Sequence, residues 1–184
     1  MKLLNGIWQV GGPCLTHSFD ATAYLVEGDG EYILIDCGTP EGYEQIKDNV
    51  RRVGVDPAKI TKIFGTHGHY DHVGAAHLWK EEFGVKLYLH EADVKQVEEG
   101  DSEMTSAAIL YGTSSTPCQV DGLLKEGDLY EAEGLRLEVM HTPGHTMGSL
   151  CFDVTRDGYR LLIAGDTLWG GYSAKIGSDE AAWR

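Results

Sequence analysis

The densest chemical feature of this sequence is THGHYDH, residues 66–72, which places three histidines and one aspartate in six consecutive positions. The whole chain of 184 residues holds only eight histidines. Imidazole nitrogens and carboxylate oxygens together form a ligand set suited to zinc, iron or manganese. A polar loop without metal is the alternative, but such crowding favours a metal site.

The chain before this cluster indicates how its side chains meet. The β-branched and aromatic run 60–67 predicts a strand that leads into the cluster. Side chains two positions apart on extended chain point to the same side, so His67, His69 and Asp71 are expected to converge. His72 is out of phase and reaches the same point if the chain turns there into the helix expected over residues 73–84.

A second group of candidate ligands lies in HTPGHT, residues 141–146. His141 and His145 are four apart, which on a helix would be a ligand pair. Pro143 excludes a helix, because it lacks the backbone N–H and forces the residue before it to be extended. The stretch is therefore predicted to be a strand end and a tight turn. His145, past the turn, is the candidate ligand, and His141 is not.

An aspartate in IAGDTLW, residues 163–169, is the third candidate. Asp166 ends the apolar run 159–166, which we expect to be a central, buried strand. A carboxylate in that place is costly unless it is paired or bound to metal. Asp36, in ILIDCG, has a similar context, but we interpret it as a hydrogen-bonded organiser of its loop.

The rest of the chain predicts a mixed α/β fold in a single domain, residues 1–184. The 24 glycines imply many turns and a strand-rich structure. Residues 100–122 are open between helix and loop. Strands are expected at 6–12, 22–30, 31–40, 60–67, 85–90, 128–134, 135–141, 149–154 and 159–166, and helices at 41–53, 73–84 and 91–99.

Composition excludes several classes of partner. The net charge of −14 disfavours nucleic acid and anionic membrane surfaces. The first residues form neither a signal sequence nor a spanning helix, so we expect a cytoplasmic protein that acts on a small molecule. The four cysteines are scattered without metal-site spacing and are expected to be buried thiols.

These motifs carry a family resemblance. THGHYDH resembles the H-x-H-x-D-H signature of the metallo-β-lactamase fold superfamily, and HTPGHT and AGDTLW resemble its next two ligand motifs in the same order. The resemblance covers nearly the whole chain and implies a four-layer αββα sandwich with metals at one edge. It implies two divalent ions, with Zn²⁺ preferred and Fe or Mn as alternatives. Its ligands would be His67, His69 and His145 for one metal, Asp71 and His72 for the second, and Asp166 as the bridge.

One departure from the family pattern concerns the second metal. That metal normally takes a further histidine beyond the bridging aspartate, and no histidine follows His145 in this sequence. A helix that starts near Ser178 also stops at Arg184 after a few residues. We therefore expect that the chain lacks its last elements, and that it forms a homo-oligomer or associates with the missing C-terminal segment.

The resemblance implies a glyoxalase-II-like or lactonase-like metallohydrolase. A metal-bound hydroxide would attack an ester, thioester or lactone carbonyl, with Asp71 as the catalytic residue that orients it and moves its proton. Tyr70, Trp169 and Tyr172 flank the ligands and are candidates for the substrate pocket. Two alternatives stay open: an iron-dependent persulfide dioxygenase that uses the first-site residues, and a catalytically silent fragment.

Overall fold

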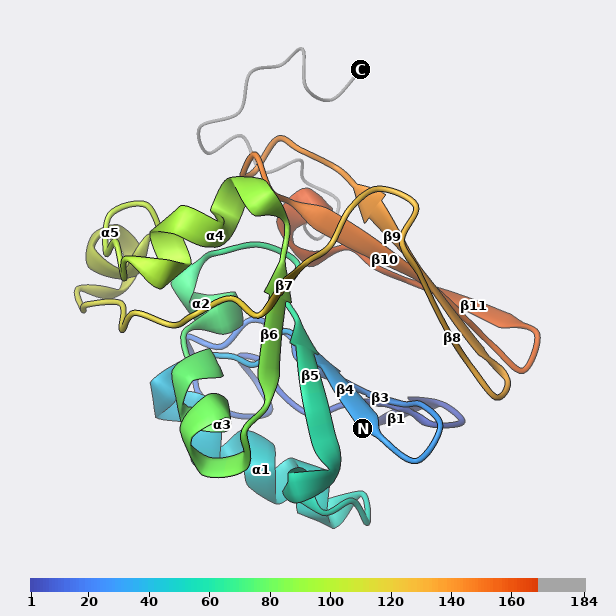
Figure 1. The fold of residues 1–184 in the computed structure, drawn as a ribbon. Helices are drawn as coiled ribbons and strands as arrows, with labels where there is room; N and C mark the ends of the chain where they lie inside the picture. The colour runs from blue at the N-terminus through green and yellow to red at the C-terminus, as the bar shows by residue number, and fades with distance from the viewer. Residues whose placement is uncertain (169–184) are drawn as a thin grey trace.

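The structure, a computed structural model, describes residues 1–168. In this part of the chain two β-sheets face each other, and helices cover the outer face of the first sheet (Figure 1). The first sheet has seven strands in the order β1-β2-β3-β4-β5-β6-β7, and the second has four in the order β11-β10-β9-β8. The described residues thus contribute one helical layer and both sheets of the αββα sandwich.

The strands of the first sheet are β1 (Lys2–Leu4), β2 (Ile7–Gln9), β3 (Tyr24–Glu27), β4 (Tyr32–Ile35), β5 (Ile60–Phe64), β6 (Lys86–Leu89) and β7 (Gly122–Leu123). Those of the second are β8 (Leu129–Ala132), β9 (Leu135–His141), β10 (Leu150–Arg156) and β11 (Tyr159–Ile163). The helices are α1 (Tyr43–Arg52), α2 (Tyr70–Val73), α3 (Ala76–Phe83), α4 (Glu91–Glu98) and α5 (Ala107–Tyr111), with short 3₁₀ turns at Pro40–Gly42, Pro57–Lys59 and Gly165–Thr167. Within residues 1–168, no helix has the length and apolar character that crossing a membrane requires.

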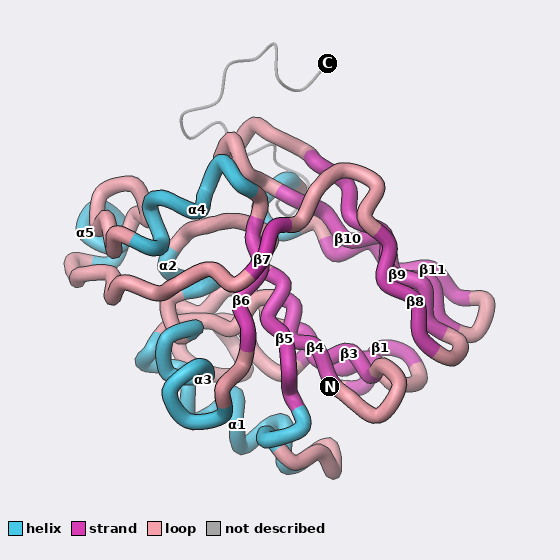
Figure 2. The backbone as a smooth tube through the Cα atoms, in the orientation of Figure 1, coloured by secondary structure: helices cyan, strands magenta, loops and turns pink. Residues whose placement is uncertain are grey.

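The direction of the strands determines where a site can form. Strands β1 to β4 pair antiparallel, whereas β4, β5, β6 and β7 pair parallel. Parallel neighbours need crossover connections, and helices supply them: α1 after β4, α2 and α3 after β5, and α4 and α5 after β6 (Figure 2). The carboxyl ends of β4, β5 and β6 therefore meet at one edge of the sheet, and the histidine cluster follows β5.

Two apolar layers hold the sandwich together. Consecutive residues of β4 belong to different layers. Leu34 packs toward the helices with Trp79, while Ile33 packs between the sheets with Phe152. All four side chains are fully buried. Burying a side chain of this size contributes about 1.5–3 kcal/mol, so both faces of the first sheet stabilise the fold.

Most predicted elements are present, with one helix divided. The helix expected at 41–53 is α1, preceded by a 3₁₀ turn, and the helix expected at 91–99 is α4. The helix expected at 73–84 is split into α2 and α3. The Ala75 N–H donates to the carbonyl of Gly38 at 3.0 Å instead of to its own helix, and this interrupts the hydrogen-bond ladder. Residues 100–122, left open above, contain α5 and β7.

Two expectations from the sequence are wrong. Strand β11, expected to be central and buried, lies at the edge of the second sheet in the described part of the chain, and its Leu162 is 46% exposed. The central, almost wholly buried strand is β10. An apolar run cannot by itself distinguish the two cases. Among the cysteines, Cys14 is exposed, because it lies in the loop after β2, while the other three are buried as expected.

Candidate metal centre

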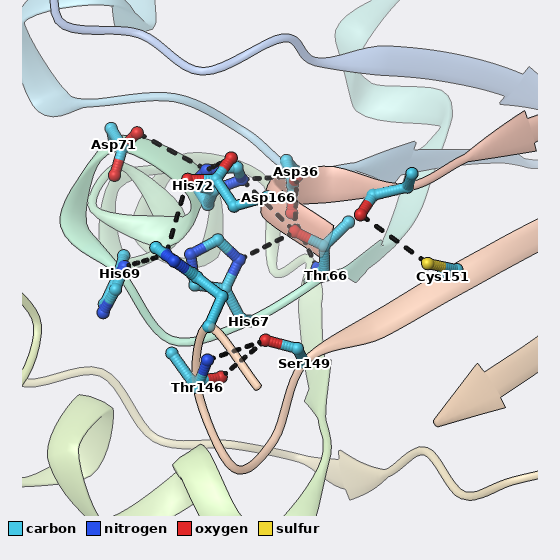
Figure 3. A network of polar contacts seen from close by, with 12 residues as sticks. Asp36, Thr66, His67, His69, Asp71, His72, Thr146, Ser149, Cys151 and Asp166 are labelled. Atoms are coloured by element: carbon cyan, nitrogen blue, oxygen red, sulfur yellow. Dashed lines mark hydrogen bonds and ion pairs between the residues drawn. The ribbon is translucent and has the colours of Figure 1, made fainter. Parts of the chain in front are cut away.

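Three segments far apart in the sequence meet at the carboxyl edge of the first sheet (Figure 3). The histidine cluster connects β5 to α2, the turn between β9 and β10 carries His145, and the 3₁₀ turn after β11 carries Asp166. The predicted strand end and tight turn around Pro143 are confirmed, because β9 ends at His141.

The first group of potential ligands is His67, His69 and His145, which offer nitrogens within 4.8 Å of one another. The closest pair is His145 Nε2 and His69 Nδ1, 2.9 Å apart. His67 Nδ1 contacts the Thr66 hydroxyl at 3.1 Å, while its buried Nε2 has no hydrogen-bond partner in residues 1–168. A buried polar atom without a partner is unusual in a folded protein, and a bound cation would satisfy this one.

The second group is His67, His72 and Asp166. The two carboxylate oxygens of Asp166 face in different directions: Oδ1 lies 3.3 Å from His72 Nε2, and Oδ2 lies 3.4 Å from His145 Nε2. Asp166 therefore belongs to the second group and also faces His145 of the first. A set of imidazole and carboxylate donors in this arrangement fits divalent transition metals.

Asp71 reaches the site differently from what the sequence suggested. The convergence of His67 and His69 is confirmed, but the strand expected to bring Asp71 to the same side ends at Phe64, and helix α2 begins at Tyr70. Asp71 belongs to neither group of three. Its Oδ2 lies 3.4 Å from His72 Nε2, which keeps it at the margin of the second group.

Asp36, which was expected to organise its own loop, instead holds the first of these segments in place, because its carboxylate contacts Thr66 and His72. It follows β4 with a positive φ of 57°, a conformation that aspartate tolerates better than most residues. Its Oδ1 accepts the Thr66 backbone N–H at 2.8 Å, and its Oδ2 lies 2.7 Å from His72 Nδ1. When His72 Nδ1 donates this hydrogen bond, its Nε2 is left to face Asp166.

Burial determines the charge of the imidazoles. It lowers the pKa of His67 well below the ordinary value, and with the neighbouring His145 it lowers that of His69 to about 3, so both are neutral donors. Burial also disfavours the charged form of His72, but the carboxylates of Asp71 and Asp36 raise its pKa well above the ordinary value. Burial lowers the pKa of His145 as well, so the three imidazoles of the first group are neutral, whereas His72 is paired with carboxylates.

A cavity of about 610 Å³ opens over the two groups. Side chains from the loop after β2, from α5 and from the end of β11 form its apolar wall. This wall includes Phe19, Leu110, Tyr111 and Leu168. The lining includes four aspartates and three histidines and, in the described part of the chain, no lysine or arginine.

The pocket residues predicted from sequence differ from these. The prediction for Tyr70 is wrong: its ring is buried, and its hydroxyl donates to Glu41 Oε2 at 2.9 Å, because the start of α2 turns it away from the cavity. Trp169 and Tyr172 lie outside the described residues. Phe19 and Leu110 were missed, and the only signal for Leu110 was an apolar run in the segment left open.

Several known proteins resemble this chain in sequence or in fold. The sequence model of the metallo-beta-lactamase superfamily matches residues 19–182. An uncharacterized protein of Aquifex aeolicus is 36% identical over 79% of this chain and 63% of its own length. The probable metallo-hydrolase YqgX of Bacillus subtilis is 30% identical over 82% of this chain and 67% of its own length.

Among solved structures, a metallo-beta-lactamase of Cronobacter sakazakii superposes with a TM-score of 0.75 at 27% identity, over 88% of this chain and 62% of that one. The chain belongs to the metallo-beta-lactamase superfamily, and the fold predicted from its motifs is confirmed. It spans only about two thirds of the length of these relatives.

Proposed function

We propose that this chain is the metal-binding part of a hydrolase that cleaves an ester, thioester or lactone carbonyl in a small molecule. The observation that carries the proposal is the carboxylate of Asp166, which belongs to the second group of potential ligands and also faces His145 of the first. The net charge of −14 supports a small-molecule substrate over a polyanion. The superfamily membership supports metal-dependent chemistry.

The described residues fit two divalent cations, with Zn²⁺ as the first candidate and Fe or Mn as alternatives. His67, His69 and His145 would hold one cation, and His72 and Asp71 would contribute to the second, with Asp166 between them. When bound, such cations polarise a carbonyl oxygen and lower the pKa of water toward neutrality.

Asp71 is the residue proposed to move a proton. Hydrolysis adds one water, breaks the acyl C–O or C–S bond, and delivers a proton to the leaving oxygen or sulfur. The Asp71 carboxylate lines the cavity beside His72. Burial and the nearby Asp166 raise its pKa, although His72 opposes this.

The cavity wall supports an uncharged, apolar acyl group as the part of the substrate that it contacts. Phe19 and Leu110 are 39% and 57% exposed and face the same cavity as the ligand groups. In residues 1–168, no lysine or arginine lines the cavity to pair with an anionic group of the substrate. An apolar acyl group would instead bury this exposed wall.

The test combines elemental analysis with a substrate series. Purified protein should contain close to two zinc ions per chain and hydrolyse nitrophenyl butyrate faster than the succinyl ester, which carries a carboxylate. Removal of metal with a chelator should abolish the activity, and added Zn²⁺ should restore it. One iron per chain, with oxygen uptake on glutathione persulfide, would replace the proposal with a dioxygenase. Absence of metal would leave a catalytically silent scaffold.

A further inference from the structure

Asp93, in the first turn of α4, is a buried carboxylate that the proposed reaction does not use. It is 2% exposed. A buried carboxylate is costly unless its oxygens accept hydrogen bonds, so its partners reveal its role. Those partners come from the two segments that carry candidate ligands: residues 65–69, called here the first ligand loop, and residues 142–149, called the second ligand loop.

Both carboxylate oxygens are occupied. Asp93 Oδ2 accepts the backbone N–H of Gly68 at 2.8 Å and the hydroxyl of Thr146 at 2.8 Å. Asp93 Oδ1 accepts the backbone N–H of Gly148 at 3.0 Å. Gly68 lies between His67 and His69, and Thr146 follows His145, so one side chain joins the positions next to all three members of the first group.

Both loop positions approach α4 closely and are glycines. A Cβ on Gly148 would lie 2.5 Å from Asp93 Cγ and 2.9 Å from Asp93 Cβ, so a side chain there would displace Asp93. A Cβ on Gly68 would lie 2.5 Å from Gln96 Nε2 and 3.1 Å from Asp93 Cβ, so the Gln96 side chain would have to move. The close contact thus depends on residues of α4, Asp93 and Gln96, and on the glycines of the two loops.

The loops are also joined in a way that does not depend on Asp93. The backbone N–H of Leu150 donates to the carbonyl of Thr66 at 2.7 Å. In addition, His90, which caps α4, stacks on His141 with ring centroids 4.0 Å apart. These contacts should preserve the fold when Asp93 is changed. The role left to the Asp93 carboxylate is to fix where the tips of the two loops lie.

We propose that Asp93 is a positioning residue that sets His145 relative to His67 and His69, so that the three imidazoles can bind one cation. This inference rests on the proposed function. The positioning role requires a side chain whose two oxygens both accept hydrogen bonds, as the carboxylate of Asp93 does. An asparagine has one accepting atom, so its NH₂ group must face the N–H of either Gly68 or Gly148, and one loop loses its anchor.

The first test is metal affinity. Asp93→Asn should weaken the binding of Zn²⁺, measured by competition with a chelator, by about 10–100-fold, the usual effect of changing a partner that orients ligands. The visible spectrum of the Co²⁺-loaded protein should change as well, because it reports the arrangement of the ligands. Thr146→Val, which removes one of the three donors, should give a smaller loss of affinity.

Asp121→Asn is the matched control. Asp121 also accepts a backbone N–H, from Leu87 at 2.9 Å, and it pairs with Lys80, but these contacts touch neither ligand loop. This variant should bind Zn²⁺ like the wild type. Equal Zn²⁺ affinities in the wild type and in Asp93→Asn would overturn the proposal.

Amide exchange in the metal-free protein separates this inference from the proposed function. In Asp93→Asn the amides of Gly68 and Gly148 should exchange at least about tenfold faster, because each loses a charge-assisted hydrogen bond or its geometry. In Asp121→Asn they should not change. If the wild type binds no metal but these amides respond, the proposed function fails and the positioning role stands. If they do not respond, the positioning role fails.

Discussion

Asp36 Oδ2 and His72 Nδ1 lie 2.7 Å apart, and both side chains are almost completely buried. The same carboxylate also accepts the hydroxyl and the backbone N–H of Thr66. One residue at the end of β4 thus sets both the start of the first ligand loop and the orientation of the imidazole at its far end.

Replacing Asp36 with asparagine tests this relationship without straining the backbone, because asparagine also tolerates the positive φ at this position. Removal of one partner from a buried ion pair typically costs about 3–5 kcal/mol, so the free energy of unfolding should fall by that order. Urea unfolding measures it. Zinc content should fall as well, since His72 is no longer held. A free energy within 1 kcal/mol of the wild type would contradict the role given to Asp36 (roughly the size of one neutral hydrogen bond).

Asp71→Asn tests the proton-transfer role. The asparagine has nearly the same shape but cannot take up a proton, so turnover should fall by about 10²–10⁴-fold, the usual contribution of general acid–base catalysis. The circular dichroism spectrum should not change, because Asp71 is a partly exposed residue at the cavity. Measured turnover equal to that of the wild type, at equal metal content, would exclude the role.

Leu110→Asp tests the apolar wall of the cavity. Leu110 is 57% exposed, so the substitution should leave the fold intact while placing a negative charge beside the acyl group. We expect KM for an apolar ester to rise by about 5–150-fold, since the lost contact corresponds to about 1–3 kcal/mol. Ile109→Asp is the matched control: Ile109 precedes it on α5, is 72% exposed and is absent from the cavity lining. Equal effects of the two substitutions would show that the result is only electrostatic or structural.

The candidate ligands could be predicted from the sequence because metal sites concentrate chemistry that is rare elsewhere. Three histidines within six positions can be recognised from the sequence alone, without knowledge of the fold. The residues that hold them are a different case. Asp93 is one acid at the start of one helix, and its role depends on two loops that reach it from separate strands. Tyr70 was assigned to the pocket by proximity in sequence, yet helix α2 turns it toward Glu41. A strand-like alternation gives the wrong direction once a helix begins.

The carboxylate of Glu31 links the two sheets, and the stability that this link contributes should depend on pH. Its carboxylate accepts hydrogen bonds from Lys62 and Thr61 beside it and from Tyr130 on β8 at 2.8 Å, so it connects the first sheet to the second. Burial opposes its ionisation, but these hydrogen bonds lower the pKa of Glu31 from 4.5 to about 2.

Because the pKa of Glu31 is lower in the folded state, its contribution to stability is fully present above pH 4.5 and is lost as the pH falls toward 2. Glu31→Gln should therefore reduce the free energy of unfolding near pH 7, and the difference from the wild type should shrink through this window. Urea unfolding at a series of pH values measures it, with the exposed Glu81→Gln on α3 as the control. A difference that stays constant from neutral pH to the acid end of the window would show that Glu31 does not connect the sheets through its charge.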